Sequence, residues 1–271
     1  MDWKRNNSFF IAIDKKDQIN DIIKQTADKL AQSQTKAPLI PIVPVTVSAD
    51  SLAPYITDLS SVPLWIDIHT AKVLSFDFIQ NKITQIIGNY IITEQQFLLE
   101  LLKILNLLQD TKLKIIDFAD VIDDVSEFED YSNDNFTDAI RQIVINEKEE
   151  AKQMIYVIIG IGRIYDKVLD EGIDTLFKIF SSVQNYKKSS FIIIDNYSIF
   201  RKIMKEEWYQ KNVVTSKGVW VGADIEVQTA ITCANMSKGD INEEFPGIIY
   251  VANGDDSAVL KGIGSRPEEE F

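Results

Sequence analysis

The chain has few of the residues that build disulfides, metal sites and nucleic-acid interfaces. Of its 271 residues, one is cysteine (Cys233), one is histidine (His69) and five are arginine. A single cysteine excludes an internal disulfide and a cysteine-only metal site, and a single histidine excludes a multi-histidine zinc site. The net charge of −13 argues against nucleic acid, because its binders hold phosphates with clustered lysine and arginine. We therefore predict no metal ion and no nucleic-acid partner.

The chain also lacks a long apolar run. No stretch approaches the ~20 consecutive apolar residues that a membrane-spanning helix needs, so we predict no direct membrane span in this fragment. Apolar residues nevertheless make up 45% of the composition, which is enough for a sizeable core. The length fits one large α/β domain with an N-terminal appendage.

The first 47 residues differ in pattern from the rest. Residues 14–34 have the spacing of an amphipathic helix, and Pro38, Pro41 and Pro44 favour an extended connector. We expect residues 1–47 to form an N-terminal helix and a proline-rich connector from a preceding domain. The main domain is then predicted over residues 48–271.

From residue 64 onward, apolar runs of strand length alternate with helical patterns. This alternation predicts an α/β fold with a mostly parallel central sheet and helices on both faces. Short β runs beyond Lys217 predict antiparallel additions near the C-terminus. The expected strands are 65–67, 73–76, 83–87, 113–118, 154–161, 190–195, 218–221, 225–231, 247–252 and 258–261, and the expected helices are 93–109, 136–153, 170–186 and 198–209.

Residues 83–108 have the layout of a strand, a phosphate loop and a helix. A working G-x-x-x-x-G-K-[ST] loop needs a second glycine, a lysine and a hydroxyl, and Thr93, Glu94 and Gln95 stand in those three places. Glu94 would repel a phosphate by about 4 kcal/mol per pair of unit charges at an effective dielectric near 20. Thr93 and Gln96 also have the spacing of a capping box, which would satisfy the first amides of the helix. The vestigial nucleotide-binding position comprises Gly88, Asn89, Thr93, Glu94 and Gln95.

The acid that accompanies Mg²⁺ in nucleotide enzymes is missing from its expected place. Such an acid follows an apolar strand, but the run at 156–159 is followed by Gly160. Gly160 is therefore a vestigial acidic-motif position. The run at 191–194 does end in Asp195, which is an alternative metal-associated acid but lies one strand too late in chain order. Otherwise Asp195 caps the helix that begins near Ser198. No catalytic residue is assigned.

The densest negative charge lies between Asp117 and Asp134, where eight carboxylates occur. The segment lacks the mid-loop glycine of a calcium loop. We expect a solvated acidic loop, and a contact site for a basic neighbour is the alternative.

Several segments, taken in order, resemble a known family. In this order they resemble the last ATPase-like domain of the EssC/EccC proteins, which are FtsK/SpoIIIE-type coupling proteins of the type VII secretion system. The segments are the proline-rich connector at 38–44, the lead-in at 45–59, residues 86–96, the pair 157–168 and 191–200, and the late element at 216–231.

The resemblance implies a RecA-like P-loop NTPase fold for residues 48–271. It implies a hexameric motor in which this segment is the soluble C-terminal part of a membrane-anchored protein, at the cytoplasmic face of the cell membrane. The implied partners are secreted small helical-hairpin proteins and effectors, together with neighbouring ATPase domains of the same chain. In the family, the terminal domain is implicated in recognising substrates.

Two functions are left open by these residues. The first is a catalytically degenerate ATPase-like domain that recognises substrates and regulates the motor, with no cofactor expected. The alternative is a divergent ATPase domain that still binds or hydrolyses Mg·ATP to drive protein export. The substitutions at Thr93, Glu94, Gln95 and Gly160 favour the first.

Overall fold

The computed structural model describes residues 43–44, 46–68, 70–234, 236, 247–253 and 256–264. All of them belong to one compact unit, Ile42–Phe271. The predicted helix at 14–34 and most of the connector lie outside the described residues. The domain boundary after residue 47 therefore stays a prediction.

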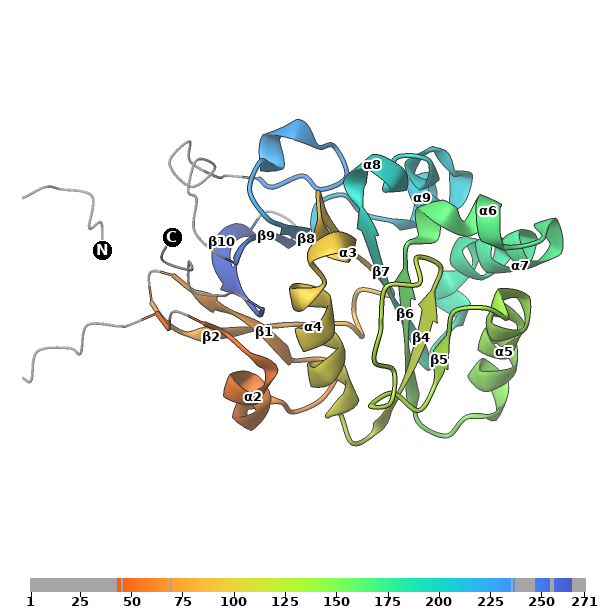
Figure 1. The fold of residues 1–271 in the computed structure, drawn as a ribbon, viewed down its shortest axis with the longest axis horizontal. Helices are drawn as coiled ribbons and strands as arrows, with labels where there is room; N and C mark the ends of the chain where they lie inside the picture. The colour runs from red at the N-terminus through yellow and green to blue at the C-terminus, as the bar shows by residue number, and fades with distance from the viewer. Residues whose placement is uncertain are drawn as a thin grey trace, which may run out of the picture. The chain divides into compact units, whose positions relative to one another are not determined.

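A single ten-stranded sheet organises the domain (Figure 1). Its strand order is β2-β1-β10-β9-β8-β3-β7-β6-β4-β5. The six strands from β8 to β5 are parallel to one another, while β9, β10, β1 and β2 are joined by antiparallel pairings. The predicted α/β class with antiparallel additions is confirmed. The strands are β1 Val62–Asp67, β2 Val73–Phe76, β3 Ile83–Gly88, β4 Thr111–Asp117, β5 Tyr131–Ser132, β6 Gln153–Ile159, β7 Ser189–Asn196, β8 Lys217–Val221, β9 Ile248–Asn253 and β10 Asp256–Gly262.

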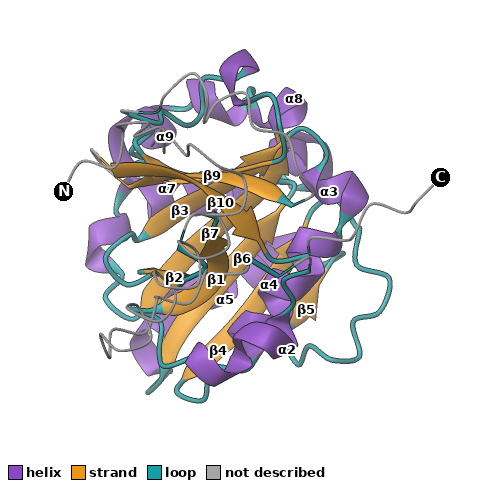
Figure 2. Ribbon diagram, turned by 90° about the vertical axis from the view of Figure 1, so that its left-hand side faces the viewer, coloured by secondary structure: helices purple, strands orange, loops and turns teal. Residues whose placement is uncertain are grey.

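Helices cover both faces of this sheet (Figure 2). The central parallel strands are buried on both sides, so they read as continuous apolar runs rather than alternating ones. One core layer lies under α2 and α4, and a second lies under α5, α7 and α9. The α-helices are α2 Ala49–Leu52, α3 Ile91–Glu94, α4 Gln96–Asn106, α5 Phe136–Glu149, α6 Ile164–Lys167, α7 Asp170–Ser181, α8 Tyr197–Phe200 and α9 Glu207–Asn212.

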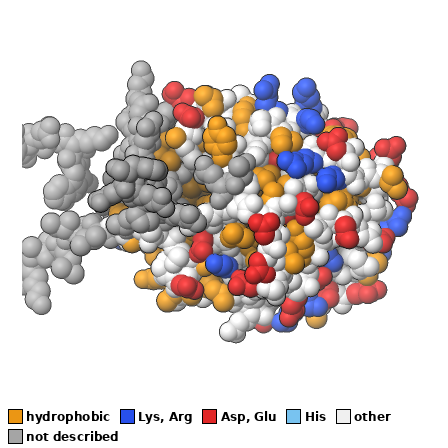
Figure 3. Space-filling model, viewed as in Figure 1, with side chains coloured by type: hydrophobic (Ala, Val, Ile, Leu, Met, Phe, Trp, Pro, Cys, Tyr) orange, Lys and Arg blue, Asp and Glu red, His pale blue; other side chains and the backbone are white. Residues whose placement is uncertain are grey.

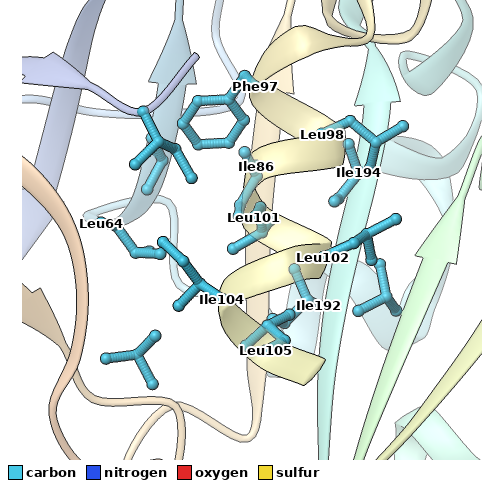
Figure 4. Packing of buried hydrophobic residues seen from close by; sticks show 14 of the residues in the cluster. Leu64, Ile86, Phe97, Leu98, Leu101, Leu102, Ile104, Leu105, Ile192 and Ile194 are labelled. Atoms are coloured by element: carbon cyan, nitrogen blue, oxygen red, sulfur yellow. The ribbon is translucent and has the colours of Figure 1, made fainter. Parts of the chain in front are cut away.

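Helix α4 is apolar around most of its circumference because it packs between several elements. Leu98, Leu101 and Leu102 are fully buried. Figure 4 shows these leucines in one buried cluster with Ile192 and Ile194 of β7. Only the short helix α3 separates α4 from β3, so the packing of α4 anchors the C-terminal end of this connection.

Ion pairs contribute little to holding this fold. In every ion pair of the described residues, at least one side chain is 47% or more exposed. Exposed pairs stabilise by only about 0–1 kcal/mol. The face in Figure 3 accordingly shows acidic and basic side chains interspersed with apolar ones. The apolar core therefore carries the stability.

Several sequence predictions of regular structure are wrong in detail. The helices expected at 136–153 and 170–186 end earlier, at Glu149 and Ser181. The helix expected at 93–109 is two helices, α3 and α4, separated at Gln95. The helix expected at 198–209 is broken into α8, a 3₁₀ turn at Ile203–Lys205 and α9. A single straight helix would turn part of this apolar set away from the sheet, and the break buries all of it: Phe200, Ile203, Trp208 and Tyr209.

The strand expected at 225–231 is a turn. Asp224 has a left-handed backbone (φ 60°), and a 3₁₀ turn follows at Ile225–Val227. The Gln228 amide then closes the loop, since its Nε2 donates to the Ile231 carbonyl and its Oε1 accepts from the Ile231 amide. Local side-chain bonding of this kind competes with strand pairing. The remaining predicted strands are confirmed within one or two residues at most ends, although β1 starts at Val62.

Candidate functional site

The candidate site lies where β3 ends, at the carboxyl edge of the parallel strands. Open α/β sheets bind their ligands at this edge. Gly88 ends β3 and lies tightly against β8, because a Cβ there would be 2.5 Å from the Val221 carbonyl oxygen. Asn89 and Tyr90 form the turn, and Tyr90 is 65% exposed.

The residues that would form a phosphate loop are wound into a helix. Thr93 and Glu94 lie in the single-turn helix α3. A phosphate loop needs backbone amides that are free to face the phosphates. Here the amide of Ile92 donates to Oδ1 of Asn196, at 3.0 Å. At least this amide of the loop is therefore satisfied by the protein itself.

The start of α4 differs from the predicted capping box. Thr93 lies inside α3 instead of capping a helix, and the N-cap of α4 is Gln95, which has φ 53° and makes no side-chain cap hydrogen bond. The first turn of α4 is covered by Gly264, whose Cβ, if present, would be 2.8 Å from the Phe97 nitrogen. The N-terminus of α4 is thus packed closely against the turn that carries Gly264.

Gly160 lies just after β6, where the sequence analysis placed the missing acid. Its backbone is left-handed (φ 68°), and an added Cβ would lie 2.7 Å from the Ala119 Cβ. Its amide donates to the Ile194 carbonyl of β7. A glycine is required by this backbone and this contact, so a carboxylate could not be placed here without moving the chain.

Asp195 lies one strand nearer than Gly160 to the turn that follows β3. It lies on β7, which is next to β3, and its partner in the register is Ile87. The side chain is fully buried, with Oδ2 accepting from the Gly162 amide at 2.7 Å and Oδ1 from the Asn196 amide at 2.8 Å. The helix cap expected for Asp195 is not what forms, because α8 starts at Tyr197 with no side-chain cap bond.

Burial raises the pKa of Asp195 to about 7. The two amide hydrogen bonds and the positive charges of Arg163 and Lys202 act in the opposite direction but are smaller. Among the described residues, no group of three or more His, Cys, Asp or Glu side chains could hold a metal ion. Through its bond to the Gly162 amide, Asp195 ties the loop after β6 to the end of β7.

Seven of the eight carboxylates between Asp117 and Asp134 are exposed, as expected for a solvated acidic loop, and Asp117 is the exception. It is fully buried at the end of β4, and its carboxylate accepts from the amides of Ala119, Asp120 and Val121, each at 2.9 Å. The Tyr131 hydroxyl donates to it as well, at 3.0 Å. This acid organises the loop rather than facing solvent. The sequence signal that could have identified Asp117 as a buried acid is its place at the end of an apolar strand, which Asp195 shares.

The sequence analysis missed Asn196. It follows an acid at the end of a strand, and nothing local distinguishes it from other polar residues that leave a strand. Its role depends on β3 and β7 being neighbours in the sheet. Gly88, Asn89, Asn196 and the helix α3 are brought together, whereas Gly160 lies one strand farther away, at the end of β6.

Comparisons with known proteins identify the fold. No protein-family model and no curated protein matches the chain in sequence. The cytoplasmic domain of EssC matches with a TM-score of 0.66 at 12% identity, over 93% of this chain and 54% of that one. Thermomonospora curvata EccC (ATPases 2 and 3) in complex with a signal sequence peptide matches with a TM-score of 0.58 at 13% identity, over 93% and 49%.

A third similar structure is the pCW3 conjugation coupling protein TcpA in monomer form with ATPγS. Its TM-score is 0.54 at 14% identity, over 90% of this chain and 81% of that one. At these identities the likeness shows the fold alone. The chain has the fold of the EssC and EccC ATPase domains, as the sequence resemblance predicted, and it spans about half the length of these EssC and EccC structures.

Proposed function

We propose that the chain is a catalytically degenerate ATPase-like domain of a type VII secretion coupling protein, and that it recognises secreted proteins and regulates the motor. The observation that carries the proposal is the bond between the Ile92 amide and Asn196. It uses, within the protein, an amide of the loop that in an ATPase would face phosphate. The fold shared with EssC and EccC supports the secretion context.

Three further features support a site without Mg·ATP. Glu94 stands where a phosphate loop has lysine. Gly160 has no room for a side chain at the place of the Mg²⁺-associated acid. Asp195, the alternative acid, already accepts two backbone amides. Mg·ATP would need Glu94 and these bonds to rearrange, so we propose that the domain has no nucleotide cofactor.

The proposed partners follow from the fold and the comparison structures. The EccC structure contains a signal sequence peptide, so peptide recognition is known for a protein of this fold. We propose secreted small helical-hairpin proteins and effectors as ligands, and neighbouring ATPase domains of a hexameric motor as contacts. The proposed location is the cytoplasmic face of the cell membrane. Across the part of the chain that the structure describes, no helix is both long and apolar enough to cross a bilayer.

Titration calorimetry with Mg·ATP and Mg·ATPγS tests the loss of nucleotide binding. We expect no binding heat up to about 1 mM nucleotide, which excludes dissociation constants in the micromolar range. TcpA, whose structure contains ATPγS, is the positive control. Micromolar binding heat from this chain would instead support the alternative function, a divergent ATPase that drives export.

Export measured in a secreting cell tests the recognition role. Deleting the region 1–271 from the parent protein should abolish effector export while the remaining motor still hydrolyses ATP. Unchanged export after this deletion would contradict the proposal. Loss of both export and hydrolysis would contradict it too, because the region would then be needed for the motor's chemistry.

A further inference from the structure

The break between α3 and α4 is not explained by the local sequence. Gln95 is a good helix former, and the sequence pattern predicts a helix that runs through it. In the structure its backbone has φ 53° and ψ −22°. Residues with a Cβ rarely adopt a positive φ. Something outside the two helices therefore holds Gln95 in this conformation.

Gly264 is the contact that accounts for the break. It lies in the turn after β10 with φ 78°, and an added Cβ would be 2.8 Å from the Phe97 nitrogen and 2.9 Å from the Gln96 carbonyl carbon. In a continuous helix the Phe97 amide would donate to the Thr93 carbonyl. Gly264 lies close to the nitrogen that would make this bond. Its backbone thus competes for space with the preceding helical turn.

The turn that carries Gly264 is itself attached to the beginning of the domain. The Gly264 amide donates to the Val47 carbonyl at 2.8 Å, and the Ile263 amide donates to the Leu64 carbonyl at 3.2 Å. Val47 is 1% exposed and immediately precedes Ser48, the N-cap of α2. A displacement of the chain at Val47 would therefore reach Gly264 through one hydrogen bond.

We propose that the Gly264 turn is a wedge that keeps α3 and α4 apart, and that Val47 holds this wedge in place. When Val47 moves, the wedge withdraws, Gln95 returns to right-handed geometry, and α3 joins α4. The joined helix draws Ile92 away from Asn196 and so remodels the turn after β3. The segment by which the chain enters the domain thus controls the vestigial nucleotide position. The wedge does not require that nucleotide binds or fails to bind, so the calorimetry above tests a separate claim.

Backbone NMR of the full chain tests the wedge with a matched pair of variants. Gly264→Ala adds a Cβ against Gln96 and Phe97, whereas Gly222→Ala adds one at a left-handed glycine (φ 99°) with nothing within 4 Å. Gly264→Ala enlarges the wedge, so we expect the ¹³Cα and ¹³Cβ shifts of Gln96 and Phe97 to move while those of Gln95 stay left-handed, and Gly222→Ala to leave all three residues unchanged. Right-handed shifts for Gln95 in Gly264→Ala, or unmoved shifts of Gln96 and Phe97, would overturn the proposal.

Substitutions at Gln95 give a second test, which does not depend on whether Gly264→Ala folds. A left-handed residue is more stable as glycine, and a residue inside a continuous helix is more stable as alanine. We expect Gln95→Gly to unfold at a midpoint about 2–4 °C higher than Gln95→Ala. A higher midpoint for the alanine variant would mean that the helices are already joined, and the wedge would be refuted.

The link to Val47 is tested by Val47→Ala, with Leu52→Ala as the control. Leu52 is as deeply buried as Val47, but it lies in α2. We expect exchange of the Gly264 amide to become about tenfold faster in Val47→Ala. The Gln95 shifts should move toward the helical values in Val47→Ala and not in Leu52→Ala. Unmoved Gln95 shifts in Val47→Ala would overturn the control by Val47.

Discussion

At the residue scale, strand-end polar side chains bond to the backbone of the loops at the candidate site. Asp117, Asp195 and Asn196 all leave parallel strands, and each accepts hydrogen bonds from backbone amides of loops at the same edge. Carboxylates and amides at this edge usually serve ligands. Here they accept hydrogen bonds from loop amides of the protein itself.

Asp195 makes the stability of the fold depend on pH, and its raised pKa fixes the direction of that dependence. Its folded pKa, about 7, is above the ordinary value of 3.8, so the folded state binds more protons between these values. The contribution of Asp195 to stability is therefore fully present below about pH 4 and is lost as the pH rises through about 7. Asp195→Asn stays neutral, so its unfolding midpoint relative to wild type should increase from pH 5 to pH 8.

Thermal unfolding at several pH values measures this difference. Asp174→Asn removes an exposed carboxylate on α7 and serves as the control. A difference between Asp195→Asn and wild type that stays constant from pH 5 to pH 8 would contradict the assigned pKa. The loss of one amide acceptor in the variant adds a penalty that does not change with pH.

Asn196 is predicted to stabilise α3 through one hydrogen bond. Asn196→Ala leaves the Ile92 amide without its acceptor, which costs about 1–3 kcal/mol for a buried donor. Asn196→Asp keeps an acceptor oxygen and should retain most of the stability. Denaturant unfolding measures the free energies, and hydrogen exchange of the Ile92 amide locates the change. Equal effects of both substitutions would show that this hydrogen bond contributes little.

At the element scale, α4 connects the candidate site to the core. The helix begins beside Gly264 and buries its leucines against β1, β4 and β7, so the end near the site is fixed by packing along the rest of its length. Helix α3 has a single turn, with Ile91 and Ile92 buried in the same core layer and the Ile92 amide bonded to Asn196. Both helices that follow β3 are therefore held by this core layer, and α3 has the hydrogen bond to Asn196 in addition.

Substitutions in and beside α4 test this packing. Leu102→Ala should lower the free energy of unfolding by about 2–5 kcal/mol, because Leu102 is fully buried. Leu107 follows the last turn of α4 and is 50% exposed, so Leu107→Ala should change the free energy of unfolding by about 0.5 kcal/mol or less. Urea titration followed by circular dichroism measures both. A similar loss in the two variants would contradict the packing described for α4.

At the scale of the whole molecule, one sheet lies between two core layers and contributes side chains to both. Alternate residues of β7 face opposite sides, with Ile192 and Ile194 in the layer under α4, and Phe191 and Ile193 in the layer under α7. Because the backbone ladder is shared, loss of either layer exposes the same strands. The two layers should therefore unfold together.

Native-state hydrogen exchange tests this cooperativity. In wild type the slowest amides of β3, β6 and β7 should exchange with one common free energy of opening. Leu102→Ala, which lies on one face only, should lower that free energy by the same amount in all three strands. A decrease confined to β3, with β6 unchanged, would show that the layers open separately.

The sequence by itself determined the alternation of strands and helices, because burial on two faces leaves continuous apolar runs in strands and a stripe of apolar residues in helices. It also determined the residues in the phosphate-loop places, Thr93, Glu94 and Gln95.

Tertiary structure alone decided how those places are filled. Asn196 reaches Ile92 because β3 and β7 are neighbours, and Gly264 reaches Phe97 because β10 ends beside α4. These partners are far apart in the chain, and local periodicity carries no information about which strands pair. The break at Gln95 and the role of Asp195 follow from those contacts, since each depends on groups that only the packed sheet brings within hydrogen-bond or van der Waals distance.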